Sequence, residues 1–454
     1  MKTLRLAMMM VLVTVIFIQC KKDVMNVQSS TDALALKNAK LPNEGPIRSY
    51  AVTVENVSTN YMFFESGISS IPVGAIAAGP AHPGQSFKFS FHAGPKHKLS
   101  LATMYGFSND GFYAPSGMGI SLFSNPTTPV TGDITSQVML WDVGTQMNQM
   151  PGATNMHNGA HETVPVQLMS AVGDGYNYGT VATNLKVTLA YEGNNLFTVT
   201  VDNLMGSTTA ISPVAWVVHT MANPLFEQGM PDYGKGLQAL AEKGNAASLG
   251  QYLSMNSGYV SPVAPVLWVF HDKNDKPVFT QNKPDYGIGL EALAETGNPA
   301  PLYQSLKDKG YTTGFYATRE DNLGDGPLFP GQKYKFTIEG PVGQTLSLAC
   351  MLGASNDIFF STVDDGIKLP NDDDKTDITH LIALYDAGTE VNEYPGTQTQ
   401  ANTVESGNVR LLNDALPWPA ASKVIKVTIM NMKSEHEDKH GDKHGDKKNN
   451  PDKD

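Results

Sequence analysis

The sequence predicts a mainly β protein that contains two antiparallel β-sandwich domains. The first observation behind this prediction is alternation: apolar and polar residues alternate in short runs such as 87–91 (FKFSF) and 334–338 (YKFTI), and each run follows a Pro-Gly turn. Alternation with a period of two is typical of a strand that is buried on one face. The second observation is that long segments of the chain occur twice. The 42 glycines and 28 prolines supply the many turns that such a fold needs.

The N-terminal end has the pattern of an export signal. Lys2 and Arg5 precede an apolar run over residues 6–17, which is too short to remain in a bilayer as a spanning helix. Cys20 follows at once and resembles the lipobox cysteine of bacterial lipoproteins, which becomes the acylated first residue. We therefore expect a signal peptide over 1–19, lipidation at Cys20 and a linker over 20–46. An ordinary cleaved signal peptide is the alternative.

The expected location is the cell envelope. Lys21 directly after the cysteine favours the outer membrane, with the mature chain on its periplasmic side or at the cell surface. No later stretch is apolar for long enough to span a bilayer, so we expect the membrane to be contacted through the lipid anchor only.

Composition narrows the class of protein further. The net charge of -12 argues against nucleic acid as a partner, because phosphate binding needs clustered Lys and Arg. Only Cys350 remains once Cys20 is set aside, so no internal disulfide is expected. Cys350 lies in an apolar run and is expected to be a small core residue.

Four segments recur in the same order along the chain. Residues 83–113 align without a gap to 330–360, with 15 of 31 positions identical. Residues 141–152 match 385–396, residues 52–57 match 199–204, and residues 185–189 match 425–429. This order predicts a duplicated domain, with domain 1 at 47–192 and domain 2 at 195–431. The residues between them, Gly193 to Asn195, favour a tight turn.

The second copy is longer because it holds a further repeat. Residues 212–253 and 264–306 each show a strand, a turn and a short helix, which predicts a duplicated strand-helix insertion in domain 2 at about 212–306. Leu237, Leu240 and Ala241 fall at helical spacing, and Gly244 fits a helix C-cap. Domain 1 spans the gap with residues 63–80. After Ser434 the chain has no apolar residue, so a disordered charged tail is expected over 432–454.

Several of the repeated motifs carry a family resemblance. The blocks PGQ, LSLA and SND before an aromatic residue, then YDAGTE, and the helix GLEALAETGN resemble the bacterial proteins of the spondin N-terminal (F-spondin) domain family over roughly residues 50–431. The resemblance implies C2-like β-sandwiches with an adhesive role and no enzymatic activity. The second copy matches more closely, because the first reads WDVGTQ in place of YDAGTE, and the cysteines of the animal domains are absent.

The resemblance also implies a calcium site in each copy. Asp110 and Asp357 follow Ser-Asn, and Asp142 and Asp386 open the later motif, at the positions that bind calcium in the family. Glu339 is the expected third ligand in the second copy, where the first copy has His92. Two carboxylates with carbonyls and water suit Ca²⁺, which takes six to eight oxygen ligands. The alternative is that these aspartates only cap turns.

Three functions remain open from the sequence. The favoured one is a calcium-stabilised binding or adhesion module whose ligand is an unknown protein or glycan, without catalysis. The first alternative is an enzyme that acts on extracellular polymers, which would need convergent acid and base groups in a cleft. The second is a structural spacer without a specific ligand.

Overall fold

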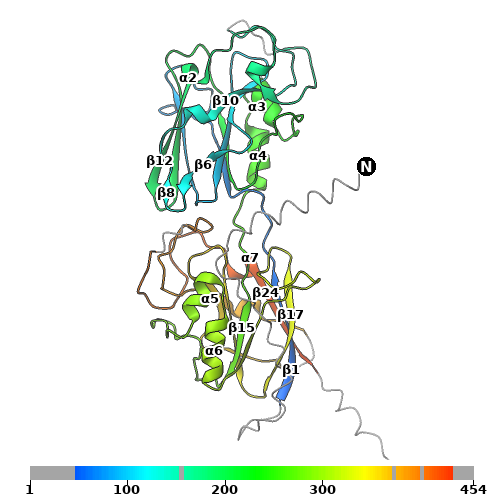
Figure 1. Ribbon diagram of the computed structural model, residues 1–454, viewed down its shortest axis with the longest axis vertical. Coiled ribbons are helices and arrows are strands. Elements are labelled where there is room, and N and C mark those ends of the chain that lie inside the picture. The colour runs from blue at the N-terminus through cyan, green and yellow to red at the C-terminus, as the bar shows by residue number, and fades with distance from the viewer. Residues whose placement is uncertain (1–46, 153–157, 371–374, 399–402, 433–454) are drawn as a thin grey trace, which may run out of the picture.

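The computed structural model describes residues 47–152, 158–370, 375–398 and 403–432. Over these residues the chain is a mainly β protein with antiparallel sheets and few helices, which confirms the predicted class. Figure 1 shows two lobes stacked along the long axis. No helix among the described residues has the length and apolarity to cross a bilayer. The expected signal peptide, Cys20 and the charged tail lie outside the described residues.

Lobe A is formed by residues 58–257 and contains two main sheets, with a helical pair on the larger one, and a separate two-stranded sheet of β7 and β8. The four-stranded sheet has the order β3-β13-β12-β9, and the larger sheet has the order β11-β10-β5-β4-β14-β2 with β6 beside β4. The elements of lobe A are β2 (Glu65–Ser69), β3 (Ser86–His92), β4 (Lys98–Met104), β5 (Gly111–Pro115), β6 (Ile120–Ser121), β7 (Phe123–Asn125), β8 (Thr128–Pro129), β9 (Gly132–Asp133), β10 (Val138–Asp142), β11 (Gln167–Leu168), α2 (Val181–Asn184), β12 (Leu185–Gly193), β13 (Leu196–Asn203), β14 (Val214–His219), α3 (Leu237–Lys243) and α4 (Ala247–Met255).

Lobe B is formed by residues 47–57 and 258–432 and repeats this plan. Its sheets have the orders β17-β1-β24-β21 and β16-β15-β18-β19-β22-β23, with β20 beside β18. The elements of lobe B are β1 (Ile47–Asn56), β15 (Val266–His271), α5 (Leu290–Thr296), α6 (Ala300–Asp308), β16 (Thr312–Tyr316), β17 (Lys333–Pro341), β18 (Thr345–Met351), β19 (Ile358–Thr362), β20 (Ile367–Lys368), β21 (Thr376–Asp377), β22 (Ile382–Asp386), β23 (Arg410–Leu411), α7 (Ala421–Val424) and β24 (Ile425–Met432).

The boundary expected between residues 192 and 195 is wrong, because it falls inside a hairpin. The strands β12 and β13 on its two sides pair antiparallel, with Leu189 opposite Val199. The strand expected to begin domain 1, β1, lies instead between β17 and β24 of lobe B, where Val52 is opposite Ile429. The pairing of β12 with β13 in lobe A and the pairing of β24 with β1 in lobe B align equivalent residues of the repeat. The register is therefore the same in both lobes, although β12 and β13 are joined by a turn and β1 and β24 are far apart in sequence. The chain therefore starts in lobe B, builds all of lobe A, and returns.

The strand-helix units are also shared differently from the prediction. The expected duplicated insertion in one domain is wrong, because β14 pairs with β4 and β2 of lobe A while β15 pairs with β18 and β16 of lobe B. Each lobe thus contains one of the two strand-helix units, β14 with α3 and α4 in lobe A and β15 with α5 and α6 in lobe B. The helical prediction itself is confirmed: Leu237, Leu240 and Ala241 are buried, and Gly244 ends α3 with a φ of 67°.

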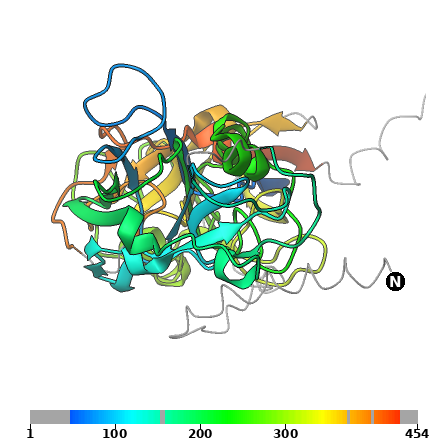
Figure 2. The ribbon, with the colours of Figure 1, turned by 90° about the horizontal axis from the view of Figure 1, so that it is seen from above.

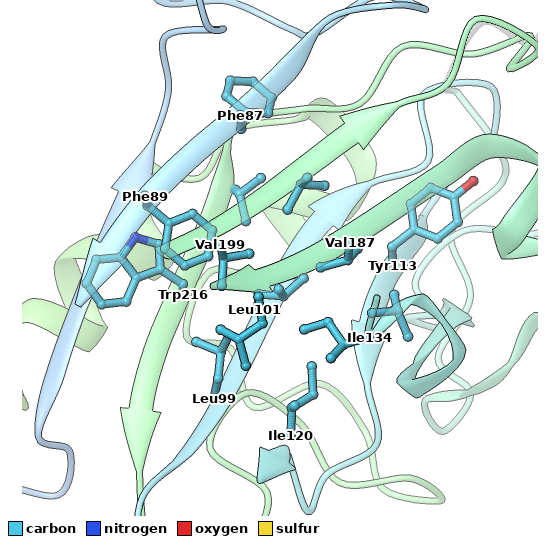
Figure 3. Packing of buried hydrophobic residues seen from close by; sticks show 14 of the residues in the cluster. Phe87, Phe89, Leu99, Leu101, Tyr113, Ile120, Ile134, Val187, Val199 and Trp216 are labelled. Atoms are coloured by element: carbon cyan, nitrogen blue, oxygen red, sulfur yellow. The ribbon is translucent and has the colours of Figure 1, made fainter. Parts of the chain in front are cut away.

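Each lobe has one core between its two sheets and a second core under its helices. Figure 3 shows the inter-sheet core of lobe A, where Phe89 and Val199 of one sheet meet Leu101 and Trp216 of the other. The Trp216 ring stacks on Phe89 with centroids 5.2 Å apart. It also fills the space above Gly67, where any Cβ would come within 2.6 Å of the indole. Cys350 is buried in the equivalent core of lobe B, as expected.

Two segments cross between the lobes, and they are tied to each other. The backbone N–H groups of Met62 and Phe63 both donate to the carbonyl of Asn256, and the N–H of Gly258 donates to the carbonyl of Phe63. The crossing is therefore a short paired ribbon and not two free linkers.

The placement of β1 in lobe B and of β13 in lobe A leads to a first prediction, which concerns fragments of the chain. A fragment of residues 58–257 contains every strand of lobe A, so it should unfold cooperatively in a circular-dichroism melt. A fragment of residues 47–192 lacks β13 and β14, which are internal strands of both lobe A sheets, and should show no cooperative transition because the remaining strands have unpaired edges. A cooperative melt of the 47–192 fragment would contradict the observed strand pairing.

Candidate functional site

The two aspartates of lobe A converge at one end of the larger sheet. Asp110 precedes β5 and Asp142 ends β10, and these neighbouring strands pair so that Asp142 lies opposite Gly111. Both side chains are fully buried. The Asp110 Oδ2 accepts hydrogen bonds from the N–H groups of Thr145 and Gln146 at 2.8 and 2.9 Å. The Asp142 Oδ1 accepts from the Gly144 N–H at 2.7 Å.

Lobe B repeats this network at the equivalent residues. The Asp357 Oδ2 accepts from the N–H groups of Thr389 and Glu390, and the Asp386 Oδ1 accepts from the Gly388 N–H at 2.7 Å. The two networks differ in the charge of the residue that lies beside the second aspartate. Arg410 donates to the Asp386 Oδ2 at 2.6 Å, whereas the residue that pairs with Asp142 in lobe A is the neutral Gln167.

Burial shifts the acidity of these groups upward. In lobe A, removal from water and the nearby Asp142 charge raise the pKa of Asp110 to about 7. In lobe B, burial raises the pKa of Asp386 to about 6 against the opposing effect of the Arg410 guanidinium. Burial also raises the pKa of Asp357. The paired carboxylates are therefore held in a setting that disfavours two negative charges unless a cation joins them.

Each network leaves the same two oxygens without a hydrogen-bond partner. In lobe A these are Asp110 Oδ1 and Asn148 Oδ1, and in lobe B they are Asp357 Oδ1 and Asn392 Oδ1. The asparagines belong to the site, because each donates to the second aspartate of its lobe at 2.9 or 2.7 Å. Buried acceptors without a donor are costly, and their recurrence in both copies suits an oxygen-binding cation.

Glu339, expected as the third ligand, does not reach this site. It is exposed near the end of β17, and β18 begins only a few residues later, whereas Asp357 follows the other end of β18. Glu339 lies opposite Ser49 and accepts a 3.4 Å hydrogen bond from its hydroxyl. Its counterpart His92 is likewise at the opposite end of lobe A. The expectation is wrong because β17 and β18 lie in different sheets, and Glu339 is next to the turn at the start of β18 whereas Asp357 follows the end of β18.

The helices contribute glutamates that the sequence analysis missed. Glu242 of α3 is buried, and its Oε1 accepts from the Thr145 hydroxyl at 2.8 Å, so it joins the Asp110 network. In lobe B the equivalent Glu295 contacts Thr389, which binds Asp357. The signal was present in the repeated Ala-Glu before Gly-Asn. The sequence analysis did not connect Glu242 with Asp110, because it predicted both strand-helix units to belong to domain 2.

An open groove of about 570 Å³ lies beside Glu242 in lobe A, between the 232–236 segment, α3 and α4. Its walls carry Asp232, whose Oδ1 is buried and unpartnered, and Tyr252, whose ring is 5.3 Å from the Lys235 ammonium. Met255 at the rim is 72% exposed. The groove therefore joins the aspartate end of lobe A to an accessible surface with polar and apolar walls.

The aspartate ends of the two lobes face different surroundings. The loop after Asp386 lies against the base of lobe A, where the Tyr394 ring stacks on His92 with centroids 3.5 Å apart and meets Phe64 edge-on. The approach is close enough to require glycine, because a Cβ on Gly94 would come within 1.6 Å of the Thr397 carbonyl. The equivalent loop of lobe A exposes Met147 and Met150.

Within the described residues, no group of three or more His, Cys, Asp and Glu side chains is arranged to hold a metal ion. A calcium ion in lobe A would therefore need the Asn148 oxygen, carbonyls or water besides the two aspartates. Comparison with protein-family models gives no match, and no curated protein matches the chain. The resemblance to the spondin N-terminal family rests on the sequence motifs.

The raised pKa of Asp110 makes a prediction about pH. A carboxyl whose pKa is raised on folding stabilises the fold fully below its unfolded pKa of about 4, and this contribution is lost as the pH rises through about 7. The loss in the cation-free chain is up to about 4 kcal/mol for a shift of this size. Asp110→Asn should therefore raise the melting temperature at pH 8 and leave it nearly unchanged at pH 4, as measured by calorimetry in chelator. A melting curve equally pH-dependent in both proteins would contradict the assignment.

The ion pair between Arg410 and Asp386 leads to a prediction about the stability of lobe B. Arg410→Gln leaves Asp386 buried without its cation and should lower the free energy of unfolding by about 2 kcal/mol, since the arginine is partly exposed. The matched change Gln167→Ala in lobe A removes no charge and should cost less than about 0.5 kcal/mol. Urea titration of both variants measures the difference, and equal losses would show that the ion pair contributes nothing.

Proposed function

We propose that this chain is a cell-envelope lipoprotein of the spondin N-terminal kind, in which two C2-like sandwiches form a calcium-stabilised binding module for a protein or a glycan. The observation that carries the proposal is the repetition of one buried network in both lobes. Each network has two aspartates, one asparagine and two unpartnered oxygens. If the aspartates only capped turns, there would be no reason for the same two oxygens to lack a hydrogen-bond partner in both lobes.

Lobe A is the better candidate for the ion. Its aspartate pair has Gln167 beside it and so keeps its full negative charge when ionised, while Arg410 already compensates Asp386 in lobe B. A bound Ca²⁺ would supply positive charge to Asp110, Asp142 and the Asn148 oxygen and would favour the ionised form of Asp110. Ligands that bind only the folded state raise its stability, so the ion would hold the loop of residues 143–152 in place.

Binding is favoured over polymer hydrolysis by the position of these carboxylates. Asp110 and Asp357 are fully buried under backbone N–H groups and do not reach a substrate chain. The accessible features of lobe A are instead a groove and exposed methionines, which suit contact with a partner. The two lobes on one tether would also place binding surfaces at fixed spacing.

An enzyme remains the second candidate because of one group in lobe B. Burial and the nearby Glu295 raise the pKa of Glu390 to about 7, which is the range of a general acid. Glu390→Gln would abolish any hydrolysis of an envelope polymer if this candidate is right. A spacer without a ligand predicts neither hydrolysis nor partner capture.

Calcium binding is tested on the mature chain by calorimetry. Addition of Ca²⁺ after chelation should raise the melting temperature, and the double change Asp110→Asn with Asp142→Asn should remove most of the rise. The matched pair Asp357→Asn with Asp386→Asn should remove less, because Arg410 already neutralises that site. A wild-type melting temperature that is the same in Ca²⁺ and in EGTA would overturn the proposal.

A further inference from the structure

The loop between β2 and β3 of lobe A is apolar and stands out from the molecule. Ile71 and Val73 are more than half exposed, and Ile76 is 102% exposed. No Asp, Glu, Lys or Arg occurs between Glu65 and Lys88. Figure 2 shows this loop as the blue segment that projects beyond the rest of the ribbon. Exposed apolar residues gathered in this way mark an interaction site more often than single exposed residues do.

The equivalent loop of lobe B has the same length and the opposite character. There Thr318, Glu320 and Leu323 stand where lobe A has Ile71, Val73 and Ile76. Glu320 forms ion pairs with Lys333 and Lys335, both at 3.2 Å. The scaffold is shared, because the N–H of Val73 donates to Ser86 and the N–H of Glu320 donates to Lys333, at equivalent positions. The fold thus accepts a charged loop here, and its apolar character in lobe A is not a packing requirement.

Two backbone hydrogen bonds lie within the 70–79 loop. The N–H of Gly79 donates to the carbonyl of Ser70, and the N–H of Ala75 donates to the carbonyl of Pro72. A loop that enters a lipid interface needs such internal bonds, because lipid offers no replacement for water. The loop is therefore a preformed apolar tip.

We propose that the 70–79 loop of lobe A inserts into a lipid surface, with Ile76 at its tip. Protein hot spots are enriched in Trp, Tyr and Arg, and the loop has none of these. Its ten residues are also few for a stable protein interface, which takes about 20 to 30 residues from each partner.

The length of chain before residue 47 allows the loop to reach the membrane of the expected anchor. Residues 21–46 span up to about 90 Å when extended. A lobe of this size has a radius of gyration of roughly 16 Å. The two lobes can therefore lie along the membrane with lobe A in contact.

The test uses the mature chain with Cys20→Ser, so that no acyl chain contributes. Co-flotation with phosphatidylcholine and phosphatidylethanolamine vesicles should recover the protein, and Ile76→Asp should reduce the recovered fraction roughly tenfold. The matched change Leu323→Asp in lobe B should leave recovery unchanged. Because insertion is apolar, about 0.5 M salt should not release the protein. Equal melting temperatures of the three proteins establish that folding is intact.

Several results would overturn the proposal. These are no flotation of the Cys20→Ser chain, flotation that Ile76→Asp leaves unchanged, or flotation lost in salt. Self-association in the ultracentrifuge without vesicles that Ile76→Asp abolishes would also overturn it, because the loop would then dock on a second copy. None of these outcomes depends on calcium, so the test is independent of the proposed ion site.

Discussion

The architecture depends on one constraint, which is that each four-stranded sheet needs an internal strand with two hydrogen-bonded neighbours. In lobe A one such strand is β13, which lies between β3 and β12, and in lobe B its counterpart is β1, which lies between β17 and β24. The chain delivers β1 more than 270 residues before its neighbour β17 in sequence. Lobe B therefore cannot close its sheet until both ends of the chain have met, whereas every strand of lobe A, including the distant pair β3 and β13, comes from the continuous segment 58–257. The pairings of longest sequence separation are therefore those of β1 in lobe B, and we expect this sheet to close more slowly.

The crossing ribbon then fixes how the two lobes stack. Because both segments between the lobes are paired at Asn256 and Phe63, the aspartate end of lobe B is pressed against the base of lobe A. The same end of lobe A has no lobe above it. Two sites with nearly the same hydrogen bonds thus differ in access: one is part of a junction, and the other opens to solvent beside the groove.

Much of the local structure was predictable, and the assembly was not. The alternation in 87–91 and 334–338 and the helix around Leu240 follow from short-range patterns, and the meeting of Asp110 with Asp142 was implied by the family resemblance. The sheet that each copy of a strand joins does not follow from such patterns, because residues 52–56 of β1 and 199–203 of β13 have nearly the same sequence, so the sequence alone does not distinguish their partners. The wrong domain boundary had a second consequence. Because β14 and α3 were predicted to belong to domain 2, Glu242 was not predicted to contact Thr145.

The placement of Glu339 failed for a different physical reason. Glu339 lies near the end of β17, beside the turn that leads into β18, whereas Asp357 lies beyond the other end of β18. The length of β18 therefore separates the two side chains, although they are close in sequence. Arg410 could not be predicted either, because it lies on a two-residue strand outside the repeated segments and is placed beside Asp386 by the pairing of β23 with β22.

The exchange of strands also changes which copy is expected to make contacts. The copy with the closer motif, lobe B, neutralises its aspartate pair with Arg410 and packs its loop against lobe A. Lobe A lacks that arginine, lies farther from residue 47 and carries the groove, the exposed methionines and the apolar loop. The lobe with the weaker motif match is therefore the one with the more accessible surface. A duplicated fold whose first lobe serves as a support would show the reverse distribution, so under the proposed function we expect lobe A, and not lobe B, to make the contacts with a partner.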